Sequence, residues 1–259
     1  MSALPKPSVP TGITDYGPKD EVATLAQIRI TFKNPIIPIE RLESSDERAK
    51  LASFHIAPAL AGHFRFLTPK MVGFQADQAL PKAIRIRVSV DGDLTDVNSH
   101  RLGNEFAWTF TSEPVRVTNL PEAQDDAGAT AHPLGINPSF AISSNAELDP
   151  ASLGNATAFV AAGDASRTAA TAQLEKTTTP GPSANAEQIF DPSLQRYTYT
   201  IKPSSQLKKP TLYSLLIVPG VTPLHGNLPS DQTFKGRFAT YGALKVCWNR
   251  ACIGTQRAF

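Results

Sequence analysis

The segment DGDLTDVN places three carboxylates, Asp91, Asp93 and Asp96, within one short stretch of the sequence. Oxygen-rich loops of this kind bind calcium in many proteins. This loop lacks the following bidentate glutamate that calcium loops use, and Asp, Gly and Asn are also the residues that tight turns require. The sequence therefore favours an ordinary turn, and the alternative is a calcium site formed by Asp91, Asp93 and Asp96.

The two cysteines, Cys247 and Cys252, form a C-x4-C pair within VCWNRACIG. A structural zinc site requires four ligands, and no second Cys/His pair stands nearby. The pair is therefore a candidate disulfide in an oxidising compartment, and two independent thiols are the alternative.

The histidines and carboxylates form no recognisable catalytic motif. H-E-x-x-H, G-x-S-x-G and glycine-rich phosphate loops do not occur in the sequence. His55 and His63 stand on neighbouring strand-like segments, but the sequence supplies no third ligand for a shared metal. We expect no catalytic residue and no cofactor, and thus a protein that is not an enzyme.

Phe106, Trp108 and Phe110 alternate along EFAWTFTSE. An aromatic row of this kind either binds a sugar or belongs to a hydrophobic core. Strict alternation places the three rings on one face of a strand, which favours the core.

The composition limits the class of protein. Among 259 residues, 41% are hydrophobic, which is enough for real cores, and the 22 prolines and 16 glycines favour short strands and many turns over long helices. The net charge of +2, with scattered Lys and Arg, gives no reason to expect binding to nucleic acid or to an anionic membrane. No apolar run has the length of a membrane span, and the first residues have no signal-peptide core.

One strand-like pattern occurs twice. LPKAIRIRVSVDGDL (Leu80–Leu94) alternates strictly, with its Ile and Val side chains on one face and Arg85 and Arg87 on the other. A similar segment, LKKPTLYSLLIVPGV (Leu207–Val221), is apolar on both faces, so we expect that strand to be covered on both sides. The return of this pattern predicts a tandem duplication.

Further strand-like segments are spaced about ten residues apart, which is typical of antiparallel sandwiches. SSDERAKL favours a helical turn, and ASRTAATAQLEK is compatible with a strand or a short helix. We predict an all-β fold of two tandem Ig-like antiparallel β-sandwiches. Its parts are an extended lead-in (1–20), a first sandwich (21–114), a second sandwich (115–242) with a mobile insertion near 177–188, and the start of a truncated third domain or a tail (243–259).

The order of these segments resembles bacterial Ig-like domains of the SbsA type. The resemblance is carried by IRITFKNPI, FHIAPALAGHFRF, MVGFQADQAL, IRIRVSVDG and FAWTFTSE in the first unit, and mainly by QLKKPTLYSLLIVPG and FKGRFATYG in the second. It covers roughly residues 22–242 and is stronger in the first unit. Tandem domains of this type resemble the N-terminal part of bacterial alpha-2-macroglobulin-like proteins.

That resemblance implies a non-catalytic structural or interaction module of a secreted or cell-envelope protein, part of a protease trap. A thioester is not implied, because Asn185 stands where the motif requires a cysteine. The expected partners are other domains of the same polypeptide or a protein, including a protease, and the expected location is the periplasm, the cell surface or the medium. The alternatives are a spacer or glycan-binding module of an adhesin or surface-layer protein, and an accessory domain of a secreted hydrolase.

Overall fold

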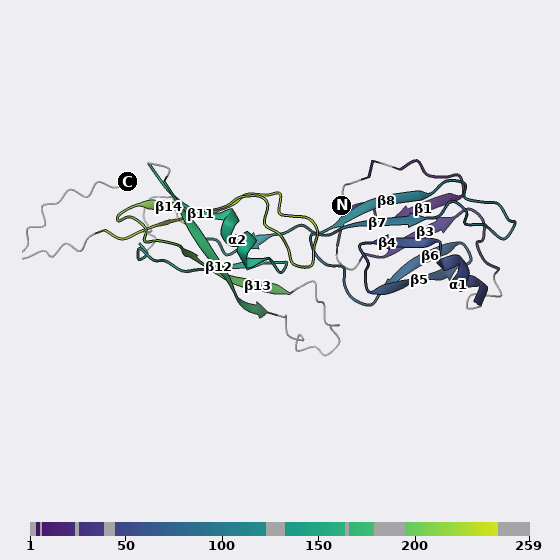
Figure 1. Cartoon of the computed structure of the whole chain (residues 1–259), viewed down its shortest axis with the longest axis horizontal. Coiled ribbons are helices and arrows are strands. Elements are labelled where there is room, and N and C mark those ends of the chain that lie inside the picture. Colours follow the sequence, from purple (N-terminus) through teal and green to yellow (C-terminus); the bar gives the residue numbers. More distant parts are fainter. Residues whose placement is uncertain are drawn as a thin grey trace, which may run out of the picture.

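The chain folds almost entirely into β-structure. The computed structural model describes residues 4–5, 7–23, 26–38, 45–122, 133–163, 166–178 and 195–242. Figure 1 shows two sandwiches arranged end to end along the long axis of the molecule. The predicted all-β fold of two antiparallel Ig-like sandwiches is confirmed. Cys247, Cys252, the segment 243–259 and most of the insertion near 177–188 lie outside the described residues.

The first sandwich consists of two four-stranded sheets, with strand orders β1-β3-β6-β5 and β2-β8-β7-β4. The strands are β1 (Ile13–Gly17), β2 (Asp20–Val22), β3 (Ile28–Phe32), β4 (Phe54–Ala57), β5 (Gly62–Thr68), β6 (Met71–Ala76), β7 (Arg85–Val90) and β8 (Phe106–Ser112). Helix α1 (Ser45–Leu51) precedes β4, where the sequence predicted a helical turn. The strand pairs are antiparallel except β2 with β8, which is parallel.

The inward-facing side chains of β7 and β8 form the centre of the first core. Ile86, Val88 and Val90 have no measurable exposure, and they face inward as the sequence predicted. Trp108 is also buried, and its indole Nε1 donates a hydrogen bond to the carbonyl of Pro18 at 2.9 Å. The aromatic row of β8 therefore belongs to the core and is not an exposed sugar platform.

The segment expected to be an extended lead-in contributes to the first sandwich. Strand β1 pairs with β3, and β2 joins the other sheet. Ile13 and Tyr16 are buried, and the Tyr16 ring packs edge-on against Phe106 and Trp108 at centroid distances of 5.0 and 5.2 Å. Two apolar residues in a short polar and proline-rich segment are too few to reveal a strand by periodicity.

The second sandwich is built from one seven-stranded sheet with the order β15-β14-β11-β12-β13-β10-β9. The strands are β9 (Val117–Thr118), β10 (Phe140–Ser144), β11 (Thr157–Ala161), β12 (Arg167–Thr178), β13 (Arg196–Pro203), β14 (Leu212–Ile217) and β15 (Phe234–Ala239). Helix α2 (Pro150–Ala156) was not predicted, although Asp149 at its N-cap and Pro150 in its first turn are ordinary start signals. Of the described helices, none is long and apolar enough to cross a membrane.

Strand β12 connects the two layers of the second sandwich. Its first residues, 167–169, pair with β11, and residues 170–178 pair with β13. The two layers face each other through aromatic contacts, in which Phe140 of β10 lies 4.7 Å from Phe238 of β15 between ring centroids. ASRTAATAQLEK, left open between strand and helix, is thus a strand.

Strand β14 is covered on one face only, so the prediction of cover on both faces is wrong. Tyr213, Leu215 and Ile217 are buried in the second core. On the other face Leu212 is 40% exposed and Ser214 and Leu216 are half-buried, and Val218, directly after the strand, is 37% exposed. An apolar outer face with this degree of exposure is common on folded proteins and does not require a covering element.

Replacing Trp108 with Ala is expected to destabilise the protein by about 3–5 kcal/mol, because the substitution leaves a cavity and an unpaired Pro18 carbonyl. Urea unfolding followed by far-ultraviolet circular dichroism measures the loss. The matched control, Leu212→Ala on the exposed end of β14, is expected to cost less than about 1 kcal/mol. Equal losses for the two variants would contradict the assignment of Trp108 to the core.

Candidate functional site

The two sandwiches are joined by a pair of hydrogen bonds from one asparagine side chain. Asn227, in the loop between β14 and β15, accepts from the Arg85 backbone N–H at 2.7 Å and donates to the Arg85 carbonyl at 3.0 Å. The backbone N–H groups of Asn227 and Leu228 both donate to the carbonyl of Ala83, at 3.0 and 2.9 Å. This loop of the second sandwich thereby binds the start of β7 in the first as a neighbouring strand would.

A second asparagine holds the connecting segment in the same manner. Asn145, at the end of β10, accepts from the Arg116 backbone N–H at 2.8 Å and donates to the Pro114 carbonyl at 3.0 Å. Asn145 is only 7% exposed, so both bonds are shielded from water. Buried polar side chains that are fully hydrogen-bonded fix one geometry, because any other arrangement leaves them unpaired.

We call the contact between residues 82–85 of the first sandwich and residues 226–228 of the second the joint, and its backbones are closely packed. Ala83 belongs to the first sandwich in sequence, but its side chain is buried in the core of the second. The backbone of Gly226 lies so near that a Cβ there would stand 2.4 Å from the Ala83 carbonyl oxygen and 2.7 Å from that of Lys82. Only glycine fits at position 226 with this arrangement.

A short chain of ion pairs reinforces the joint. Lys82 Nζ lies 3.0 Å from Glu113 Oε2, and Arg116 Nε lies 3.4 Å from Glu113 Oε1. Burial alone would raise the pKa of Glu113, but the hydrogen bond from Lys82 and the charges of Lys82 and Arg116 lower it below its usual value. Glu113 is therefore ionised at neutral pH and links the two cations.

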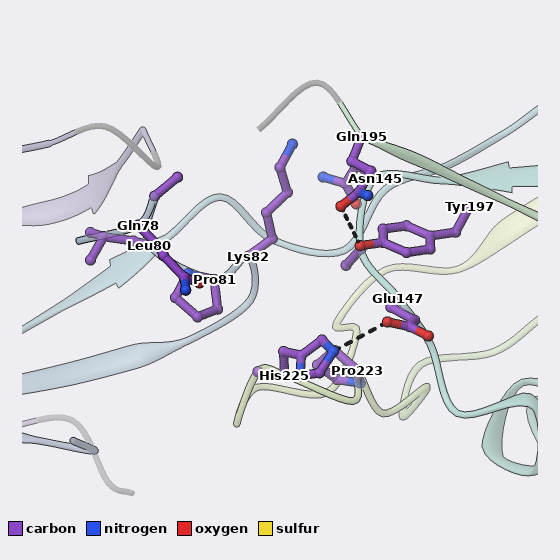
Figure 2. Close-up of a pocket in the computed structure, with 13 residues that line it drawn as sticks. Gln78, Leu80, Pro81, Lys82, Asn145, Glu147, Gln195, Tyr197, Pro223 and His225 are labelled. Atoms are coloured by element: carbon purple, nitrogen blue, oxygen red, sulfur yellow. Dashed lines mark hydrogen bonds and ion pairs between the residues drawn. The ribbon is translucent and has the colours of Figure 1, made fainter. Parts of the chain in front are cut away.

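A cleft of about 210 Å³ opens beside the joint, with walls from both sandwiches (Figure 2). Its lining residues are Gln78, Ala79, Leu80, Pro81 and Lys82 from the first sandwich, and Asn145, Ala146, Glu147, Gln195, Tyr197, Pro223, His225 and Gly226 from the second. We call this hollow the inter-sandwich cleft.

The polar groups of the inter-sandwich cleft lie mainly on its second-sandwich wall. Glu147 Oε2 lies 3.2 Å from His225 Nε2, and the Tyr197 hydroxyl donates to Gln195 Oε1 at 2.8 Å. Burial, together with the negative charge of Glu147, raises the pKa of Tyr197. The wall thus presents a carboxylate beside an uncharged aromatic ring.

The three carboxylates of the predicted turn do not converge on one point. Both oxygens of Asp91 lie 3.0 Å from His55 Nε2, and Asp93 is exposed. Within the described part of the chain, no group of three or more His, Cys, Asp and Glu side chains is placed to hold a metal ion. The structure therefore shows turn geometry at DGDLTDVN, with no shared calcium position among the described residues.

Asp96 holds the conformation of this loop through hydrogen bonds to its carboxylate. Its carboxylate accepts from the backbone N–H groups of Asn98 and His100, from the Asn34 amide, and contacts His100 Nδ1 at 3.0 Å. Burial by itself would raise the pKa of Asp96, but these hydrogen bonds outweigh burial and hold it well below the usual range.

Sequence reasoning missed the residues of the joint. Asn145, Gly226 and Asn227 look like turn formers in SSNAELDP and PLHGNLP, and nothing local shows that their partners lie in the other sandwich. The one weak indication of these contacts was the residue type, because the Asn side chain carries a donor and an acceptor like those of a peptide group.

A comparison with curated proteins finds a similar protein in Nostoc sp.. Over 244 residues, which make up 94% of this chain, the sequence is 38% identical to the alpha-2-macroglobulin homolog of Nostoc sp.. The chain is similar to a region of an alpha-2-macroglobulin homolog. It spans 13% of that relative's length, so the similarity concerns a small part of the longer protein.

The other comparisons identify neither a family nor a fold for this chain. No family model matches it, and the finer resemblance to SbsA-type domains stays a prediction. Among solved structures, an L,D-transpeptidase from Mycobacterium smegmatis is 15% identical, with 62% of this chain and 74% of that chain covered and a TM-score of 0.28. L,D-transpeptidase 3 from Mycobacterium tuberculosis is 11% identical, with 89% and 91% covered and the same TM-score. Scores this low carry no inference.

Replacing Gly226 with Ala is expected to open the joint between the two sandwiches, because the new Cβ would overlap two backbone carbonyls. We expect a loss of about 1–3 kcal/mol in unfolding free energy and a broader range of particle dimensions in small-angle X-ray scattering. Gly135→Ala is the matched control, because a Cβ there would meet only the edge of the Tyr241 ring, at an ordinary contact distance of 3.6 Å. Scattering and stability that are unchanged in Gly226→Ala would refute a tight joint.

Replacing Asp96 with Asn is expected to have an effect that depends on pH. Hydrogen bonds favour the ionised form in the folded protein, so ionised Asp96 stabilises the fold above the ordinary carboxyl value of 3.8, and this contribution is lost as the pH falls toward the lowered pKa. The stability difference between wild type and variant should be largest near neutral pH and shrink below pH 3.8. Urea unfolding at a series of pH values measures it, with Asp93→Asn as the exposed control. A difference independent of pH would contradict this role.

Proposed function

We propose that the chain is a non-catalytic structural and interaction module of a secreted or cell-envelope alpha-2-macroglobulin-like protein that traps proteases. The observation that carries this proposal is the 38% identity over 94% of the chain, because the similarity runs through both sandwiches and the joint between them. The chain spans 13% of the relative, so trapping would belong to the longer polypeptide, and the role proposed for this region is to hold other parts in place.

The structure of the joint supports a positioning role. Two asparagine side chains, two backbone bonds to the Ala83 carbonyl and a buried alanine fix the sandwiches end to end. A module that holds neighbouring domains at a fixed distance and orientation requires such a defined geometry, whereas a flexible linker does not.

Two carboxylates that are held by several polar partners support a non-catalytic role. Asp96 holds a loop, and Glu113 bridges Lys82 and Arg116 at the joint. Both have lowered pKa values, which suits permanent charge and not the proton exchange of a general acid or base near neutral pH.

The proposed partners are other domains of the same polypeptide and, through them, a protease. The end-to-end arrangement of the sandwiches in Figure 1 also suits the alternative, a spacer module of an adhesin or surface-layer protein. Glycan binding has less support, because the aromatic row of β8 is buried.

A trapping assay on the natural polypeptide that contains this chain separates these functions. Incubated with a broad-specificity endopeptidase, it should leave hydrolysis of a small chromogenic peptide intact and suppress hydrolysis of a large protein substrate. The Gly226→Ala variant should protect less of the protein substrate, and Gly135→Ala should match wild type.

Two results would refute the proposal. Unprotected protein substrate with the wild-type polypeptide would favour the spacer alternative. Turnover of peptide, ester or glycan substrates by the purified chain would show catalysis.

A further inference from the structure

We propose that the inter-sandwich cleft is a receptor for a single basic side chain, arginine or lysine, presented by an extended segment of a neighbouring domain. This inference deepens the interaction role proposed above and rests on it. The cleft combines a carboxylate, an aromatic ring and apolar walls.

The carboxylate is available to a guest. The side chain of Glu147 is 25% exposed, and its Oε2 contacts His225 Nε2 at 3.2 Å. A neutral imidazole donates one hydrogen bond at most, so Oε1 is left to accept from a cation. The side chain of His225 is 72% exposed and can move aside without disturbing the core.

The aromatic ring stands next to this carboxylate. Figure 2 shows Tyr197 and Glu147 on the second-sandwich wall, opposite Leu80 and Pro81 of the first. Cations bind over tyrosine rings, and the negative charge of Glu147 already influences the Tyr197 hydroxyl. The hydroxyl donates to Gln195, and the half-buried ring packs against the second core and lines the cleft with its remaining surface.

Lys82 is a cation in the lining of the cleft, and it is held in an ion pair. Lys82 lines the cleft, but its ammonium points away from Glu147 in Figure 2 and is paired with Glu113 at 3.0 Å. The side chain of Lys82 is 10% exposed, and its ion-pair partner Glu113 compensates its charge.

Size and apolar lining favour one long side chain over a larger ligand. A volume of about 210 Å³ admits one side chain with its stem and little more. Leu80, Pro81 and Pro223 provide apolar surface for the methylene stem of an arginine or lysine, whose head would reach Glu147. A segment bound in this way would contact both sandwiches and stabilise the joint.

The test uses N-acetyl-arginine methylamide and its neutral counterpart, N-acetyl-citrulline methylamide, titrated into the ¹⁵N-labelled chain at about pH 8, where ordinary imidazoles are neutral. The arginine probe is expected to shift the amide signals of Glu147, Tyr197 and Gly226 and to saturate at about millimolar concentration. The citrulline probe should bind at least about fivefold more weakly.

Variants identify the groups responsible. Glu147→Gln should abolish the preference for arginine, whereas Glu105→Gln, an exposed carboxylate of the first sandwich, should leave it unchanged. Tyr197→Phe should retain binding and Tyr197→Leu should weaken it about twofold to fivefold.

Equal binding of the two probes, shifts confined to other residues, or a preference that survives Glu147→Gln would overturn the proposal. These outcomes would leave the protease-trapping assay unaffected, so a failure of the receptor is distinguishable from a failure of the proposed function.

Discussion

The carbonyl of Ala83 is the point on which the arrangement of the two sandwiches depends. Two backbone N–H groups of the second sandwich donate to it, and the Ala83 side chain is buried in the second core. The Ala83 N–H donates to the Glu113 carbonyl, so the turn before β7 and the segment that follows β8 are held together. Any rotation between the sandwiches would break these bonds within a buried region, where unpaired backbone groups are costly.

Much of the fold could be predicted from the sequence because strand alternation is a local property. Ile86, Val88 and Val90 alternate with polar residues, and this pattern alone gives the inward face of β7. The weak elements were those with little periodicity: β1 has only two buried side chains, and helix α2 has seven residues. β14 was misjudged because apolar residues on a second face do not show whether anything covers them.

The candidate site was less predictable than the fold, because it is formed by residues distant in sequence. Asn227 binds Arg85 across 142 positions, and no rule of spacing connects them. Glu147 and Tyr197 likewise line one cleft with Leu80, which comes from the other sandwich. The turn containing Asp91 and Asp96 was easier to interpret, since its residue types serve local geometry.

Strand β12 has a consequence for how the protein avoids self-association. Residues 167–169 of β12 pair with β11 and residues 170–178 pair with β13, so each part of β12 keeps one unpaired side, in addition to the edge strands β15 and β9 of the described part. The first sandwich consists of two separate sheets and therefore has four edges in its described part, β1, β5, β2 and β4. Each open edge is a template on which another chain can add a strand. Both sandwiches therefore keep open edges, and solubility during folding depends on how the unpaired sides of β12 are protected as well as the edges of the first sandwich.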